Sequence, residues 1–259
     1  MYQINENIFH QYNKWKQGYT RKENSFKQRV QNFLSNREDA DIYRISKDSK
    51  YLNAYYNVVI HDEDILDGKL PVPFGEIIKG DFECSSCDSL ISLEGAPKKV
   101  DRKFECNKCK NLLSLEGAPK EVGWLFSCKR CTSLTSLVGA PEEVRGYFDC
   151  AYCINLTSLD GAPKKVGKNF NCSECKNLLS LEGAPKELDG AFDCSNCKNL
   201  TSLVGVPKKI HGYFDCSGCE NLTSIEGLPK EISGDLYIDN RFKGKIPEDV
   251  IVKGGITYE

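Results

Sequence analysis

Fourteen cysteines carry the most evident chemistry in this sequence, because all of them occur in Cys-x-x-Cys pairs. Each pair begins two residues after a phenylalanine, and successive pairs are 22 residues apart. The resulting spacing, Cys-x2-Cys-x18-Cys-x2-Cys, is also that of a zinc ribbon, in which four thiolates close a tetrahedral site. The first set with this spacing is Cys84, Cys87, Cys106 and Cys109.

Three interpretations of the cysteines compete. Redox activity requires a thiolate stabilised by a helix N-terminus or a cation, whereas these pairs fall in predicted strands and turns. Zinc binding is the alternative, but seven pairs cannot be shared two by two. Where the repeat ends, Ile238 takes the place of the first cysteine, and a free cysteine packs as a small hydrophobe. The sequence therefore favours a buried ladder of thiols and no cofactor.

A block of 22 residues, repeated seven times from Phe82 to Phe214, positions these cysteines. A constant period of this size is typical of repeat proteins, in which each unit buries its apolar side only against its neighbours. The phenylalanine and the first cysteine are two residues apart, so in a strand both point to the same side. We therefore expect a parallel sheet with these side chains in the core and the intervening residue outside.

The second half of the block predicts turns. Each repeat carries a serine, whose hydroxyl can satisfy turn backbone groups, and then a glycine, which permits positive φ. A proline follows two residues later and fixes an extended approach to the return segment. No helix of normal length fits there, so the outer side is expected to be extended or built of short turns.

Divergent turns are expected at both ends. When the sequence is aligned in rows of 22 residues, equivalent positions of successive repeats form columns. Ile60 then falls in the phenylalanine column, and Ile78 falls in the apolar column that contains Val100. Leu236 falls in the phenylalanine column, and the segment 247–250 resembles 119–122 and so places Val250 in the apolar column. The expected organisation is a helical or irregular N-terminal cap (1–56), a solenoid (57–235) and a C-terminal capping turn (236–259).

The N-terminal region predicts two helices, over 4–19 and over about 20–36. Phe26, Val30, Phe33 and Leu34 give the second one an amphipathic stripe suited to covering the end of a solenoid. The same region is basic and rich in aromatic residues, which is the alternative signature of RNA or DNA binding. The basic residues concerned are Lys14, Lys16, Arg21, Lys22, Lys27 and Arg29.

The pattern Phe-x-Cys-x-x-Cys-x-Asn-Leu-Thr-Ser-Leu-x-Gly-Ala-Pro-Lys-x-Val resembles the short leucine-rich repeats of bacteria and bacteriophages over roughly residues 57–258. The departures are a phenylalanine in place of the strand leucine and the doubled cysteine. The resemblance implies a curved, non-catalytic scaffold whose strand side binds a ligand. One concrete form is a phage or bacterial inhibitor or adaptor that acts on a host enzyme or defence protein.

Positions that vary among near-identical repeats indicate where a protein partner would bind, because the constant positions are explained by the fold. The residue after the phenylalanine forms an outward, mostly acidic stripe, and the third and fourth repeats add aromatic and basic residues that often anchor interfaces. The predicted partner-binding residues are Trp124, Leu125, Lys129, Arg130, Tyr147, Tyr152, Asp149, Asp193, Asp215 and Tyr213.

Charge, hydrophobic patterning and motif content bear on the remaining functional classes, which are nucleic-acid binding, membrane association and catalysis. The net charge of -2 gives no general attraction to nucleic acid or membranes. No stretch suits a signal peptide or a membrane span, so a cytoplasmic location is expected. Three scattered histidines assemble no catalytic set, and no phosphate-binding glycine motif follows a strand, so no enzyme is predicted.

Overall fold

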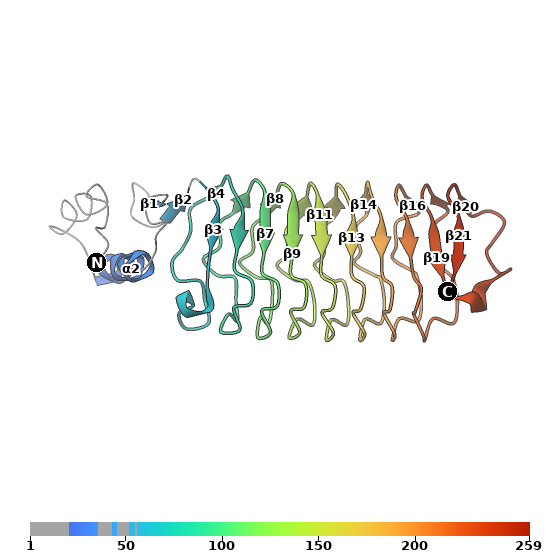
Figure 1. Cartoon of the computed structure of the whole chain (residues 1–259), viewed down its shortest axis with the longest axis horizontal. Coiled ribbons are helices and arrows are strands. Elements are labelled where there is room, and N and C mark those ends of the chain that lie inside the picture. The colour runs from blue at the N-terminus through green and yellow to red at the C-terminus, as the bar shows by residue number, and fades with distance from the viewer. Residues whose placement is uncertain (1–20, 36–42, 46–51, 55) are drawn as a thin grey trace.

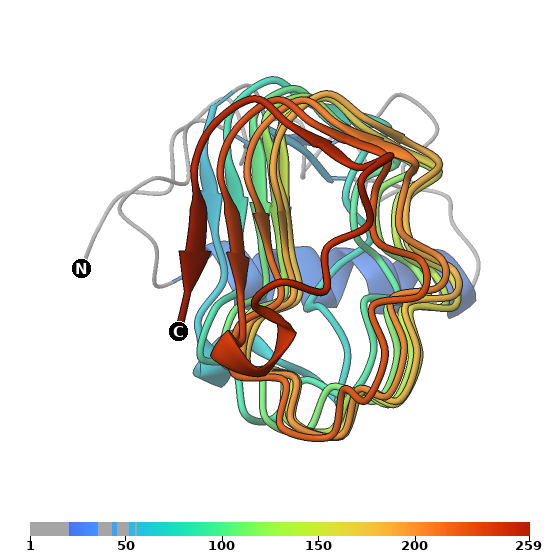
Figure 2. The same cartoon turned by 90° about the vertical axis from the view of Figure 1, so that its right-hand side faces the viewer.

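The computed structural model describes residues 21–35, 43–45, 52–54 and 56–259. Most of these residues form a parallel β-solenoid whose turns stack along one long axis (Figure 1). Viewed along that axis, successive turns lie almost on top of one another (Figure 2). The predicted repeat solenoid, mainly β with few helices, is confirmed.

One side of the solenoid is a ten-stranded sheet in which every neighbouring pair is parallel. Its register places each repeat phenylalanine beside the next, as in Phe82 beside Phe104. In spatial order the strands are β3 (Val58–Val59), β5 (Phe82–Glu83), β7 (Lys103–Glu105), β9 (Leu125–Ser127), β11 (Tyr147–Asp149), β13 (Phe170–Asn171), β15 (Phe192–Asp193), β17 (Phe214–Asp215), β19 (Leu236–Ile238) and β21 (Ile256–Tyr258).

The return side is also extended, as expected, and forms two shorter parallel sheets. The first contains β4 (Ile77–Ile78), β6 (Lys99–Val100), β8 (Glu121–Val122), β10 (Glu143–Val144), β12 (Lys165–Val166) and β14 (Glu187–Leu188), and the second contains β16 (Lys209–Ile210), β18 (Glu231–Ile232) and β20 (Ile251–Val252). Both sides therefore advance by the strand spacing of about 4.8 Å per turn. This equality explains why the rod in Figure 1 is nearly straight, whereas the leucine-rich-repeat resemblance implied a curve.

The core consists of columns of identical side chains. All seven repeat phenylalanines have no exposed area. The rings of Phe82 and Phe104 stack with centroids 5.3 Å apart and planes 4° apart, and Phe126 and Phe148 repeat this geometry. Aromatic rings this close add stabilisation beyond the apolar area that they bury. Each turn thus stabilises its neighbours through a shared aromatic column.

The turns behave as the sequence predicted. The glycines of the seven repeats have φ between +87° and +111°. In six repeats the serine hydroxyl accepts a hydrogen bond from the backbone N–H two residues later, at 3.0 to 3.4 Å. The bend of each turn therefore depends on a left-handed glycine and a local serine acceptor.

The first turn differs from the 22-residue grid. Val58 pairs with Phe82, 24 positions later, so Ile60 occupies the first-cysteine column and its predicted place in the phenylalanine column was wrong. The N–H of Ile60 donates to the carbonyl of Glu83, just as that of Cys84 donates to Glu105. The 3-10 helix η2 (Asp62–Asp64) lies within this longer turn.

The C-terminal turn deviates in the opposite direction. Leu236 lies in the phenylalanine column as predicted, but its partner Ile256 is only 20 positions later. Val252 pairs with Ile232, so the prediction that Val250 fills the apolar column was wrong. The other predicted position, Ile78 beside Val100, is confirmed.

Helix α2 (Arg21–Leu34) covers the N-terminal end of the stack (Figure 2). Val30, Phe33 and Leu34 are buried, which confirms this part of the predicted stripe. The Phe33 ring meets Phe74 edge to face at 5.9 Å, and Phe74 meets Phe82 in the same way at 5.0 Å. The helix thereby continues the aromatic column beyond the first repeat.

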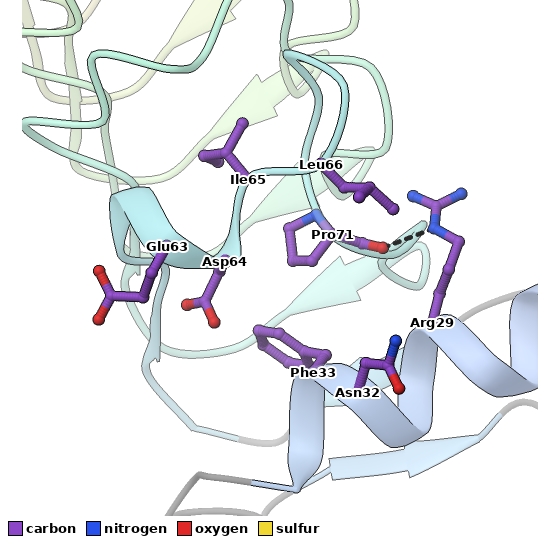
Figure 3. Close-up of a pocket in the computed structure, with 8 residues that line it drawn as sticks. All are labelled: Arg29, Asn32, Phe33, Glu63, Asp64, Ile65, Leu66 and Pro71. Carbon is purple, nitrogen blue, oxygen red and sulfur yellow. Dashed lines mark hydrogen bonds between the residues drawn. The ribbon is translucent and has the colours of Figure 1, made fainter.

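Polar contacts fix the same helix. The Arg29 guanidinium donates to the carbonyls of Pro71 at 2.7 Å and Leu70 at 3.1 Å, and Figure 3 shows it reaching the first of these. The predicted helix over 4–19 lies outside the described residues. The remaining elements of the described residues are an antiparallel pair, β1 (Tyr43–Ile45) and β2 (Leu52–Ala54), and the 3-10 helix η3 (Asn240–Phe242). Within the described ranges no helix has the length and apolar character needed to cross a membrane.

A matched pair of glycine substitutions tests the stacking. Gly139 has φ +95°, and a Cβ there would overlap the backbone of Leu115 and Glu116, whereas Gly244 has φ +75° with nothing within 4 Å. Gly244→Ala should cost about 1 to 2 kcal/mol of unfolding free energy, the penalty of a left-handed alanine. Gly139→Ala adds overpacking of about 1 to 3 kcal/mol. Equal losses in urea unfolding would contradict close stacking of the turns.

Candidate functional site

All fourteen cysteines are buried and unpaired by disulfides. In the last six repeats the second cysteine donates its S–H to the carbonyl of the first cysteine in the preceding turn, at 2.9 to 3.3 Å. Several first cysteines donate in the other direction, as Cys194 does to the carbonyl of Asp215 at 3.3 Å. The thiols therefore link neighbouring turns as weak donors.

Two cysteines of the zinc alternative, Cys87 and Cys109, direct their thiols at backbone carbonyls, and zinc binding itself stays untested. Cys109 is directed at the carbonyl of Cys84 at 3.0 Å and Cys87 at that of Ile60 at 3.5 Å. Among the residues that the structure describes, no three His, Cys, Asp or Glu side chains are grouped so that they could hold a metal ion. Burial also raises the pKa of the Cys84 and Cys216 thiols well above the usual range, which keeps them protonated in the metal-free chain.

The acidic stripe has a local structural role. The carboxylate of Asp193 accepts from the backbone N–H of Ser195 at 2.9 Å and from its hydroxyl at 2.7 Å, and Asp215 makes the same two bonds with Ser217. Asp149 accepts from the N–H of Ala151 at 2.9 Å. Burial raises the pKa of Asp149 and Asp215. Three of the predicted partner-binding residues therefore brace the Cys-x-x-Cys turn from outside.

The predicted aromatic and basic residues form two groups at opposite ends of β9 and β11. At the beginning of these strands, Trp124 meets Tyr147 edge to face with centroids 5.5 Å apart and planes 73° apart. Leu125 pairs with Tyr147 in the sheet. Trp124 is 48% exposed, and Leu125 and Tyr147 are partly exposed. We call Trp124, Leu125 and Tyr147 the Trp124 cluster.

The second group lies in the turns after β9 and β11. The Arg130 guanidinium lies over the Tyr152 ring at 4.9 Å and the Lys129 ammonium at 5.4 Å. Both contacts are within the range of cation–π attraction. Tyr213 stands apart from both groups, directly before β17, and its ring meets Tyr237 edge to face at 6.1 Å. The predicted aromatic and basic residues therefore form two patches on neighbouring turns, and Tyr213 is separate from both.

The sequence analysis did not predict the backbone conformation of the residue before each second cysteine. Six of these residues are left-handed although they are not glycine, with φ between +57° and +62°. They are Ser86, Lys108, Arg130, Tyr152, Glu174 and Asn196, and the seventh residue of the column is Gly218. Asparagine and glycine are the residues that most often adopt this conformation. Their presence in the column was the signal that could have revealed it.

The residues of the nucleic-acid alternative are described only in part. Lys14 and Lys16 lie outside the described residues, and Arg21, Lys22 and Lys27 belong to α2, in a stretch whose side chains are not described. Arg29 donates to the carbonyls of Leu70 and Pro71 and so serves to attach the helix to the solenoid. Nucleic-acid binding by this region stays a prediction.

Comparison of the chain with protein-family models, with curated proteins and with solved structures finds no match. The solenoid architecture and its regular cysteines therefore rest on the sequence and structure of this chain.

The buried thiols predict a loss of stability in mild alkali. Unfolded cysteines ionise near pH 8.5, whereas burial raises the pKa of Cys84 and Cys216 in the folded chain. Above that pH the unfolded chain binds fewer protons than the folded chain, so unfolding free energy should fall as pH rises, by up to about 1.4 kcal/mol per pH unit for each thiol.

Urea unfolding between pH 8 and 9.5, at constant ionic strength and with a reductant, measures this slope. Cys216→Ala removes one buried thiol and should lower the slope by up to about 1.4 kcal/mol per pH unit. A stability that does not change over this interval would contradict burial of the thiols.

Proposed function

We propose that this chain is a non-catalytic protein-binding module and that the Trp124 cluster is its main contact surface. The observation that carries the proposal is the exposed edge-to-face pair of Trp124 and Tyr147. Four of the seven repeats carry glycine at the position of Trp124, as Gly146 does in the next repeat. Because the solenoid does not need a tryptophan there, this side chain is available to a partner.

The cluster is held rigidly, which favours binding. The N–H of Tyr147 donates to the carbonyl of Trp124 at 2.7 Å. A Cβ at Gly146 would overlap that carbonyl, so the two turns are in close backbone contact. Tryptophan and tyrosine supply large contact areas and are enriched among residues that dominate interface energies. A fixed backbone also reduces the entropy lost when they bind.

The finer form of the proposal comes from the leucine-rich-repeat resemblance. It is a cytoplasmic inhibitor or adaptor of phage or bacterial origin that acts on a host enzyme or defence protein. The absence of catalysis is part of the same proposal, since His61 precedes η2 and His211 follows β16, far apart along the chain. His10 lies outside the described residues.

Affinity purification from cells that express the tagged chain tests the proposal. The double variant Trp124→Ala plus Tyr147→Ala should lose the partner that the wild type recovers, by about 30-fold or more, which is the size of a hot-spot effect of 2 kcal/mol. The matched control is Leu113→Ala, which removes an apolar side chain that is 63% exposed and lies outside the ten-stranded sheet. Equal recovery by wild type and double variant would overturn the proposed surface.

A further inference from the structure

A groove of about 380 Å³ lies beside the Cys-x-x-Cys turns of the first four repeats. It combines three cations with an aromatic ring, an aliphatic side chain and small hydroxyls. Its lining residues are Ser86, Asp88, Lys108, Lys110, Arg130, Thr132, Tyr152 and Ile154. The groove is therefore suited to a ligand that has both negative charge and apolar surface.

Three of these residues have a backbone conformation that costs folding free energy. Lys108, Arg130 and Tyr152 have φ of 61°, 62° and 60°, a conformation that costs most residues about 1 to 2 kcal/mol. The same turn is made with Asn196 and Gly218 in later repeats, and both residue types adopt it more readily. Stability alone would favour asparagine or glycine in all three places. The long side chains are best explained by what they contact.

The charges in the groove are only partly balanced. The Lys110 ammonium pairs with Asp88 at 2.8 Å. Lys108 and Arg130 are exposed and form no ion pair with any described residue, and Arg130 instead lies over the Tyr152 ring at 4.9 Å. One carboxylate thus faces three cations. An incoming carboxylate can pair with the planar guanidinium through two parallel hydrogen bonds.

We propose that this groove binds an acidic peptide segment of the protein partner. Its carboxylates pair with Lys108 and Arg130, and an adjoining apolar side chain packs against Tyr152 and Ile154. The inference rests on the proposed protein-binding function and gives the chemistry of the partner. A peptide is favoured over a nucleic acid because its negative charge can be confined to the groove, whereas a phosphate backbone would carry charge onward past Glu83 and Glu105 on the strands that lead to these turns.

Binding of a labelled peptide to the full chain tests the proposal. The probe is fluorescein-labelled hexaglutamate, with labelled hexaglutamine as the uncharged control. Fluorescence anisotropy should show hexaglutamate binding that weakens with added NaCl, and hexaglutamine should bind at least about tenfold more weakly.

The variant Lys108→Asn plus Arg130→Asn separates binding from folding. Asparagine stands at the same turn position in the sixth repeat, so the variant should unfold at the same temperature as wild type or a higher one. It should bind hexaglutamate at least about tenfold more weakly. The matched control is Glu174→Asn, which makes the same change one turn beyond the groove and should bind the peptide as tightly as wild type or more tightly.

The proposal would be overturned by equal hexaglutamate binding by wild type and double variant, by equal binding of hexaglutamate and hexaglutamine, or by tighter binding of a labelled single-stranded DNA of the same charge. The groove variant leaves the Trp124 cluster intact, so the two proposals fail separately. If the wild-type chain recovers a partner that the Trp124→Ala plus Tyr147→Ala variant loses, but does not bind hexaglutamate, the groove inference alone is overturned.

Discussion

The stacking of identical buried side chains in consecutive turns is the constraint on which this structure depends. Each phenylalanine ring lies against the ring of the next turn, and each second cysteine of the later repeats donates to a carbonyl of the turn before it. No single turn can bury its own apolar side, so stability is a sum over neighbouring turns. A change in the length of one internal turn would misplace every column at once. This explains the constant 22-residue period.

The same constraint acts on the inward positions of each turn and leaves the outward positions free to vary. Inward positions must match their neighbours above and below, whereas outward positions need only suit a strand or a turn. The chain therefore carries tryptophan, tyrosine and arginine outside a nearly invariant core. Trp124 occupies a position where other repeats have glycine, and Arg130 occupies one where others have asparagine or glycine. Helix α2 completes the arrangement by covering the first aromatic ring of the column through Phe33 and Phe74.

Much of the fold follows from the sequence because the period and the inward columns are explicit. The errors occurred where the period ends. An inward-outward alternation has a period of two, so a shift of two residues leaves it unchanged. Val58 and Ile60 fit the phenylalanine column equally well by pattern, as Val250 and Val252 fit the apolar column. Only the pairing in the structure distinguishes them. Column comparison identified the outward residues of the third and fourth repeats, but the contacts that divide them into two groups come from the structure.

The central claim is that all fourteen cysteines belong to the core as thiols, which leaves the outward exceptions as the proposed contact surface. Mass spectrometry after brief iodoacetamide treatment of the folded chain at pH 8 measures this directly. The account predicts no alkylated cysteine in the native state and fourteen after denaturation. Rapid alkylation of Cys-x-x-Cys pairs in the folded chain, or native protection that a zinc chelator abolishes, would contradict it.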